Sequence, residues 1–320
     1  MKSLTTALIC ALLGAALSGC WHHQRQVAPD APAFAVPPTQ QSILERINGT
    51  SRIYQLQAEN ARISLRGALL PLSANLAVER PRRMRIRGEL VGVNGIDLGS
   101  NEEVFWVYSP LMRPPGVYYA RHEDYQRSSM AEMLPLRPEW LIEALGVVQV
   151  DPSSVEGPYS RGADKLEIRT RVPGIDGTMT KVLVVDATYG WILEQYLYDP
   201  QGQPVAQVTC SEHRYYRDVD VSLPHQVEIH LPKTGATVRL DVGGYMVNQL
   251  VGDPAQLWSM PRIDGAPPRD VTQMSNVPLA ASGPFGSQPA PAPAAASQSP
   301  PNYGLAPSAA RPQYRGFPGR

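Results

Sequence analysis

Histidine, cysteine and carboxylate side chains are the groups in this sequence that could do chemistry. Acid–base catalysis and metal binding both require several such groups to converge on one point. His22 and His23 are adjacent in a Pro-rich stretch, which makes a poor metal site, and His122-Glu123-Asp124 is typical of a solvated turn. The remaining histidines are His213, His225 and His230. The pattern predicts neither a metal site nor a cofactor.

Cys210 is the only thiol in the predicted folded body, because Cys10 and Cys20 belong to the N-terminal segment. A nucleophilic cysteine needs a lowered pKa and a nearby base. The carboxylate of Glu212, two residues along, would instead raise the thiol pKa. The sequence contains no Gly-x-Ser-x-Gly elbow, phosphate-binding loop or His-Glu-x-x-His motif. We therefore expect a protein that is not an enzyme.

The N-terminal apolar segment ends in Leu17-Ser18-Gly19-Cys20. Lys2 precedes an apolar run from Leu4 to Leu17, which has signal-peptide length and is too short to span a membrane as a helix. Two small residues followed by cysteine resemble the lipobox of bacterial lipoproteins, in which the cysteine is lipidated and becomes the first residue. The alternative is an ordinary signal peptide with an incidental cysteine. We expect lipidation at Cys20, including palmitate, to hold the protein on a membrane.

The composition divides the chain into four parts. Residues 1–19 form the predicted lipoprotein signal peptide, and residues 20–40 form a lipidated Pro-rich tether. Residues 41–260 form one folded domain, and residues 261–320 form a Pro/Ala-rich tail that we expect to be disordered. This organisation predicts a lipid-anchored protein of the bacterial cell envelope that faces the periplasm. Trp21, rather than Asp, after the cysteine favours the outer over the inner membrane.

The charge balance argues against one class of partner. The chain has 29 basic and 29 acidic side chains, so its formal net charge is zero. Proteins that bind nucleic acid need a basic surface. We therefore expect no nucleic-acid partner.

Hydrophobic periodicity predicts a mainly β protein. A stripe at Ile43, Leu44 and Ile47 indicates a short helix, residues 53–58 look helical, and Pro138 to Gly146 has natural helix ends. Elsewhere apolar residues alternate with polar ones, as strands with one covered face do. Such strands are centred on 63–65, 76–78, 84–86, 104–108, 166–168, 182–185, 191–198, 205–210, 227–231 and 238–242. About ten sequential strands should form a half-open antiparallel β-barrel covered by a few helices (α+β).

Several stretches together resemble the LolA/LolB-like lipoprotein carriers. They are Leu76–Arg87, Glu103–Pro110, Tyr198–Gly202, Leu223-Pro224 and Val227–Pro232, and the resemblance covers about residues 43–248. It implies a half-open barrel wrapped over helices, with an apolar cavity that takes acyl chains. The predicted lipid on the N-terminus is more like LolB than like the soluble LolA carrier. The Pro-rich tail beyond Met260 has no counterpart in the family pattern.

A cavity of this kind would be lined by inward-facing apolar side chains. The candidates for its lining and mouth are Trp106, Met130, Met133, Leu134, Leu166, Ile168, Val227 and Ile229. An acyl chain that entered would remove apolar surface from water at about 25 cal/mol per Å². The resulting prediction is non-covalent binding of an apolar ligand, a lipid or a lipoprotein acyl chain, with a role in lipid or lipoprotein transfer. The alternatives are that these residues are ordinary core, and that the protein is an envelope scaffold with a filled barrel.

Overall fold

The structure is a computed structural model. It describes residues 29, 31–34, 37–66, 70–90, 93–128, 131, 136–174 and 177–274, all within one compact unit, Met1–Gln288. The predicted signal peptide and Cys20 lie outside the described residues, as do Met130, Met133 and Leu134 and the chain from residue 275 onward. Within the described part, every helix is too short or too polar to cross a membrane.

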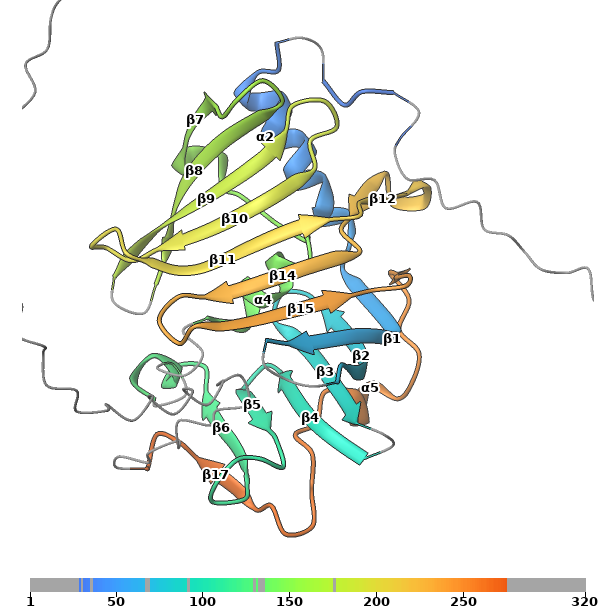
Figure 1. Ribbon diagram of the computed structural model, residues 1–320, viewed down its shortest axis with the longest axis vertical. Coiled ribbons are helices and arrows are strands. Elements are labelled where there is room, and N and C mark those ends of the chain that lie inside the picture. The colour runs from blue at the N-terminus through green and yellow to red at the C-terminus, as the bar shows by residue number, and fades with distance from the viewer. Residues whose placement is uncertain are drawn as a thin grey trace, which may run out of the picture. The chain divides into compact units, whose positions relative to one another are not determined.

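Most of the described chain forms one large sheet (Figure 1). Its strands are β1 (Gln55–Leu65), β2 (Leu72–Glu79), β3 (Arg83–Leu90), β4 (Val93–Ser100), β5 (Val104–Tyr108), β6 (Val117–Arg121), β7 (Val155–Ser160), β8 (Lys165–Pro173), β9 (Thr178–Asp186), β10 (Ile192–Tyr198), β11 (Pro204–Ser211), β14 (Gln226–Leu231), β15 (Ala236–Asp241), β16 (Met246–Val247) and β17 (Pro268–Asp270). A separate hairpin pairs β12 (Arg214–Tyr216) with β13 (Val221–Leu223). The mainly β prediction is therefore confirmed.

The order of strands leaves the sheet open. It runs β17-β6-β5-β4-β3-β2-β1-β15-β14-β11-β10-β9-β8-β7, and β16 pairs with β1. Among the described strands, neighbours in this order pair antiparallel, except that β17 pairs in parallel with β6. The described sheet thus has fifteen strands rather than about ten. The short strands β16 and β17 show no alternation that could reveal them, and β17 takes the sheet beyond Met260, where the sequence predicted the tail to begin.

The helices and 3-10 turns are few and short. They are α2 (Gln40–Asn48), α4 (Pro138–Ala144), α5 (Pro254–Leu257), η1 (Gly49–Arg52), η2 (Tyr125–Arg127), η3 (Pro152–Ser154) and η4 (Arg217–Val219). The Thr39 hydroxyl accepts from the Ser42 backbone N–H and so caps α2, while Pro138 occupies the first turn of α4. The helical prediction for residues 53–58 is wrong, because Leu56 and Ala58 pair with β2 as part of β1.

Helices α2 and α4 lie on one face of the sheet, which we call the inner face. On β9, Lys181 contacts Glu143 of α4, and Leu183, two residues along, packs in one cluster with Ile43 and Ile47 of α2. Residues two apart on a strand point to the same side. Figure 1 shows α2 behind β8–β10 and α4 behind β14 and β15.

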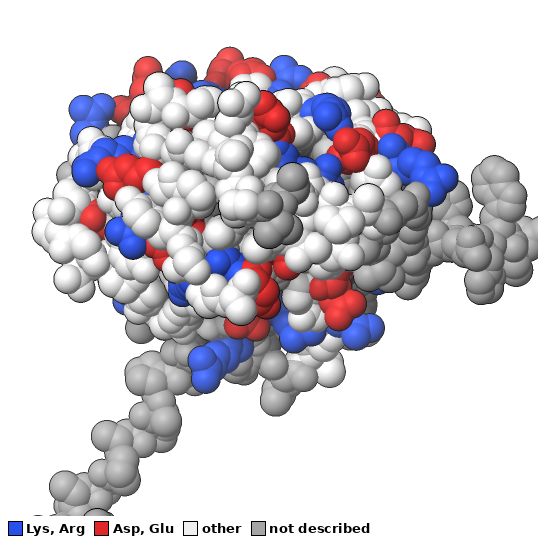
Figure 2. Space-filling view, turned by 90° about the horizontal axis from the view of Figure 1, so that it is seen from above, with Lys and Arg blue, Asp and Glu red and all other residues white. Residues whose placement is uncertain are grey.

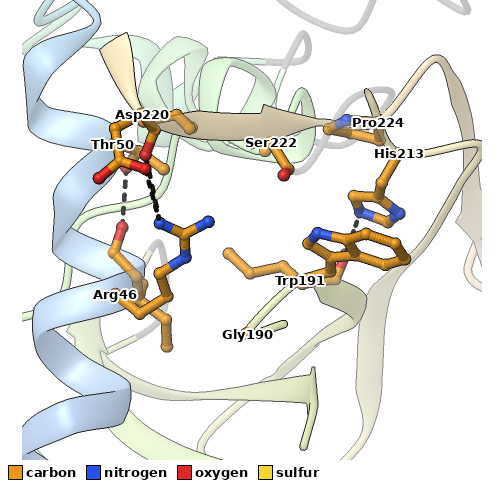
Figure 3. A pocket seen from close by; sticks show the side chains of 12 residues that line it. Arg46, Thr50, Gly190, Trp191, His213, Asp220, Ser222 and Pro224 are labelled. Carbon is orange, nitrogen blue, oxygen red and sulfur yellow. Dashed lines mark hydrogen bonds and ion pairs between the residues drawn. The ribbon is translucent and has the colours of Figure 1, made fainter. Parts of the chain in front are cut away.

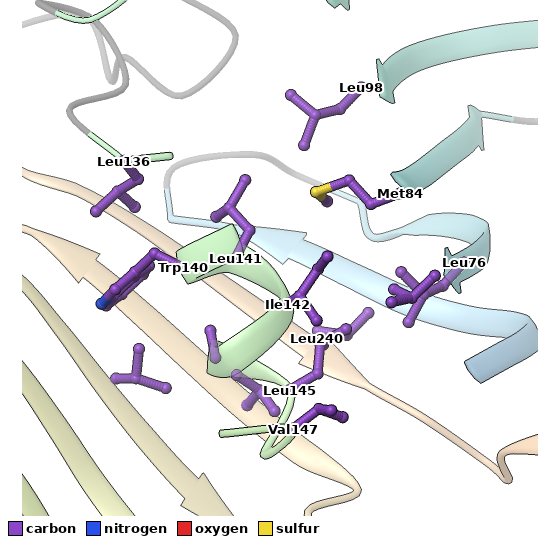
Figure 4. Close-up of a cluster of buried hydrophobic side chains, with 14 of the residues drawn as sticks. Leu76, Met84, Leu98, Leu136, Trp140, Leu141, Ile142, Leu145, Val147 and Leu240 are labelled. Atoms are coloured by element: carbon purple, nitrogen blue, oxygen red, sulfur yellow. The ribbon is translucent and has the colours of Figure 1, made fainter. Parts of the chain in front are cut away.

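Helix α4 packs between the two halves of the sheet. Its buried residues Trp140, Leu141 and Ile142 belong to a cluster that also contains Leu76 of β2 and Leu240 of β15. Figure 4 shows Leu141 and Ile142 pointing toward β2–β4, whereas Trp140 projects from the opposite side of the helix. The inner face is therefore filled by α4 on the side of β2–β4, and space remains on the side of Trp140.

Candidate functional site

A pocket of about 290 Å³ lies on the inner face between α4 and strands β8–β10. Its lining residues are Arg137, Glu139, Trp140, Glu143, Val172, Pro173, Gly174, Met179, Lys181 and Leu197. We call it the α4 pocket. The volume is close to the lower end of the range found for small-molecule sites, about 300–1,000 Å³.

Strand alternation places the apolar wall of the α4 pocket. Met179 shares the inner face of β9 with Lys181, and Leu197 shares the inner face of β10 with Gln195, whose amide reaches α4. Val172 lies at the end of β8, paired with Met179 across the ladder. These side chains and the indole of Trp140 give the pocket two apolar sides.

Ion pairs form the polar wall. The Lys181 ammonium contacts the Glu143 carboxylate, and Arg82 Nε lies 3.3 Å from Glu139 Oε1. Gln195 Nε2 donates to the backbone oxygen of Glu143 at 2.9 Å, which ties α4 to β10. Arg137 is exposed and has no ion pair with any residue that the structure describes. The charged groups of the α4 pocket are therefore all paired except one cation.

The indole nitrogen of Trp140 has no hydrogen-bond partner among the described residues. The side chain is only 6 % exposed, so bulk water does not satisfy the N–H group either. A buried donor without an acceptor costs about 1–3 kcal/mol. Trp140 thus lines the α4 pocket, while its buried N–H group stays without a partner in the described chain.

The structure does not bring the predicted cavity residues together. Leu166 and Ile168 pack with α2, whereas Val227 and Ile229 pack in the cluster around α4. Trp106 lies on the outer face, where its Nε1 donates to Asp97 Oδ1 at 3.0 Å. Among the residues that line the α4 pocket there is none of these five.

Trp106 belongs instead to a polar arrangement under α5. Arg85 forms an ion pair with Asp97 at 2.8 Å and donates to the carbonyl oxygens of Gln256 and Leu257 at 2.8 and 3.0 Å. Its guanidinium carbon lies 5.7 Å from the centre of the Trp106 ring. Arg85 therefore fastens α5 to the sheet, and Trp106 packs beside Arg85 and Asp97 and does not line the α4 pocket.

Sequence reasoning missed every residue that lines the α4 pocket. Trp140 stood in a correctly predicted helix, but its orientation depends on which strands lie opposite α4. Met179 and Lys181 lie just before the apolar run Val182 to Val185, which indicates a buried strand. A lysine entering such a run was the one signal that could have marked the site, because a buried ammonium needs a partner.

The histidines and Cys210 are held in structural roles in the described part of the chain. His213 Nε2 lies 3.1 Å from the carbonyl oxygen of Ile192, and burial lowers the pKa of His213 to about 4. His122 Nε2 lies 2.8 Å from the carbonyl oxygen of Asn101. Burial raises the pKa of the Cys210 thiol to about 12, which keeps it protonated and unreactive.

His213 also borders a second, much smaller pocket, of about 20 Å³ (Figure 3). Its ring stacks on Trp191 with centroids 5.1 Å apart. Trp191 Nε1 and Ser222 Oγ, which line this pocket, have no hydrogen-bond partner among the described residues. The volume is about that of one water molecule.

The described residues form neither a cluster of metal ligands nor a basic patch on the face shown in Figure 2. In the described ranges no three His, Cys, Asp or Glu side chains are placed to hold a metal ion. Figure 2 shows Lys and Arg interspersed with Asp and Glu over the face that it presents. This mixture agrees with the formal net charge of zero.

Comparison with known proteins gives similarity in structure only. No protein-family model matches the chain, and no curated protein matches it in sequence. A DUF1329 family protein from Desulfovibrio piger is 15 % identical, with a TM-score of 0.47 over 67 % of this chain and 96 % of that one. A domain named for outer-membrane lipoprotein sorting from Vibrio parahaemolyticus is 14 % identical, with a TM-score of 0.43 over 65 % of this chain and 92 % of that one. A LolA superfamily protein from Nitrosomonas europaea is 13 % identical, with a TM-score of 0.42 over 69 % of this chain and 98 % of that one. The last of these three proteins is named for the LolA superfamily.

Proposed function

We propose that this protein binds an acyl chain of a lipid or lipoprotein non-covalently in the α4 pocket and passes it to a membrane or a partner. The observation that carries the proposal is the open space of about 290 Å³ beside Trp140 on the inner face of the sheet. Val172, Met179 and Leu197 provide apolar contact along it. Burying an acyl chain against them is favourable by about 25 cal/mol per Å².

The N-terminal segment would determine where the protein is located. Lipid on Cys20 would anchor the protein to the envelope, with residues 20–40 as a tether, and the open sheet would act as a half-barrel around α4. The proposed location is the outer membrane, with the folded domain facing the periplasm. Replacement of Cys20 by Ala should move the protein from the membrane fraction to the soluble fraction, and retention in the membrane would contradict the anchor.

Lipid that copurifies with the protein tests the binding function. Full-length Cys20→Ala protein should yield lipid on mass spectrometry of an organic extract. A Met179→Trp change, which fills the α4 pocket, should remove that lipid. The matched control is Tyr198→Trp on β10, whose side chain stacks on Tyr196 on the other face of the sheet and should leave the lipid in place.

The same experiment separates the proposal from the scaffold alternative. Leu141 and Ile142 of α4 are buried against the sheet, as a filled scaffold would require. Protein that carries no lipid and takes up no apolar probe at micromolar concentration would favour the scaffold.

A further inference from the structure

The size of the α4 pocket limits how much of a ligand it can enclose. Its volume is about 290 Å³. A methylene group takes up about as much space as a water molecule in the liquid, about 30 Å³. The pocket therefore has room for about ten carbons of a chain. The two chains of a diacyl lipid, with about sixteen carbons each, would need about 1,000 Å³, more than three times that volume.

The burial of the lining residues gives the pocket a mouth and a floor. Arg137 and Pro173 are exposed, so the pocket opens to water beside them. Met179 and Leu197 are 7 % and 5 % exposed, and they close the pocket on the side of the sheet. A chain that enters therefore places its tail against Met179 and Leu197 and leaves its polar end at the mouth.

The polar wall offers no free charge to a ligand headgroup inside the pocket. The Lys181 ammonium is paired with Glu143, and Glu139 is paired with Arg82. The Lys181 side chain is only 2 % exposed. A carboxylate or phosphate buried beside these pairs would be an additional unpaired charge, which is costly. The polar end of the ligand therefore stays outside, and the length of the chain decides the fit.

We propose that the α4 pocket takes one unbranched chain of a single-chain amphiphile of the fatty-acid type and encloses about ten of its carbons, with Leu197 at the floor setting this length. This inference rests on the proposed function and adds the class and size of the ligand. Carbons beyond about the tenth remain in water at the mouth and add little to the affinity. A lipid with several long chains enters with one chain, and only in part.

A series of straight-chain fatty acids tests the length. Full-length Cys20→Ala protein is titrated calorimetrically at pH 8 with the acids of six to fourteen carbons, each below its micelle concentration. The affinity should rise about three- to fourfold for each added methylene up to about ten carbons, because each of these is buried. Beyond that length it should rise by less than about 1.5-fold per methylene, because the added groups stay in water.

Two outcomes of this series are distinct. A constant rise in affinity up to fourteen carbons, or a rise that ends below eight, overturns the inference and leaves the proposed function standing. Failure of every acid to bind overturns the proposed function itself.

Two variants assign the floor to Leu197. Leu197→Ala removes three carbons from the floor, so the affinity should level off at about thirteen carbons instead of ten. Leu183→Ala is the matched control, because Leu183 is also buried on the inner face but packs with α2 and does not line the α4 pocket. Its affinity should still level off at about ten carbons. An unchanged length in folded Leu197→Ala protein contradicts the role of Leu197. If that variant does not fold, Leu197→Val, which removes one carbon, should move the length by about one carbon and takes its place.

Discussion

The ammonium of Lys181 on β9 pairs with the carboxylate of Glu143 on α4, and this contact joins the helix to the sheet at the polar wall of the α4 pocket. The two partners differ in exposure: the Lys181 side chain is 2 % exposed and the Glu143 side chain 25 %. Water can therefore reach the carboxylate but not the ammonium.

The two halves of this ion pair should differ in the cost of their removal. Glu143→Leu leaves a buried ammonium unpaired and should lower the free energy of unfolding by about 3–5 kcal/mol. Lys181→Met leaves a carboxylate that water still reaches, so its cost should be smaller, about 1–2 kcal/mol. Urea unfolding of both variants and of the double variant measures the difference. A double variant no more stable than Glu143→Leu would contradict the assignment of the cost to the unpaired ammonium.

His213 should make stability depend on pH. Because burial lowers its pKa to about 4 in the folded protein, the unfolded chain, with a histidine pKa of about 6.5, binds the proton first as the pH falls. The contribution of neutral His213 to the free energy of unfolding is fully present above pH 6.5. It is lost between about pH 6.5 and 4, by up to about 3 kcal/mol.

The measurement compares the wild type with His213→Phe, which cannot titrate, in urea unfolding at pH 7.5, 6 and 5. The wild type should lose stability relative to the variant as the pH falls. A constant difference across this range would show that His213 titrates normally.

Cys210 should resist thiol reagents while the protein is folded. Its thiol is buried and its pKa is raised to about 12, so almost no thiolate exists at pH 8. In a protein with Cys10→Ser and Cys20→Ala, a chromogenic disulfide reagent should react only after urea is added. Rapid reaction at pH 8 without urea would show that β11 opens readily.

Gly99 should tolerate no side chain. It pairs with Trp106 across β4 and β5, and an added Cβ would lie 2.2 Å from the indole ring. Gly99→Ala should therefore lower the free energy of unfolding by about 1–3 kcal/mol, as overpacking does. At Gly243 an added Cβ would meet nothing within 4 Å, so Gly243→Ala should change stability by less than about 0.5 kcal/mol. Equal effects of the two changes on the free energy of unfolding would show that the Trp106 ring does not pack against Gly99.

Local patterns in the sequence predicted the elements better than the site. The stripe at Ile43 and Ile47 predicted α2, and alternation at Val227 and Ile229 predicted β14 and its inner face. Residues 104–108 are apolar on both sides, so the pattern could not tell that Trp106 faces outward.

The α4 pocket could not be predicted because it depends on contacts between distant elements. Trp140 and Leu197 are 57 residues apart, and they line the same pocket because α4 packs against β8–β10. No local pattern in the sequence predicts this packing. The lone lysine on β9 was a hint of a buried partner, but it did not say that the partner was Glu143.

Photo-cross-linking locates a bound acyl chain most directly. A fatty acid with a diazirine in mid-chain is irradiated with full-length Cys20→Ala protein, and the labelled peptides are sequenced by mass spectrometry. Saturable labelling is expected at Val172, Met179 and Leu197, and it should be lost in Met179→Trp and kept in Tyr198→Trp. Labelling that is unsaturable, or that falls on the outer face and is unchanged in Met179→Trp, would contradict binding in the α4 pocket.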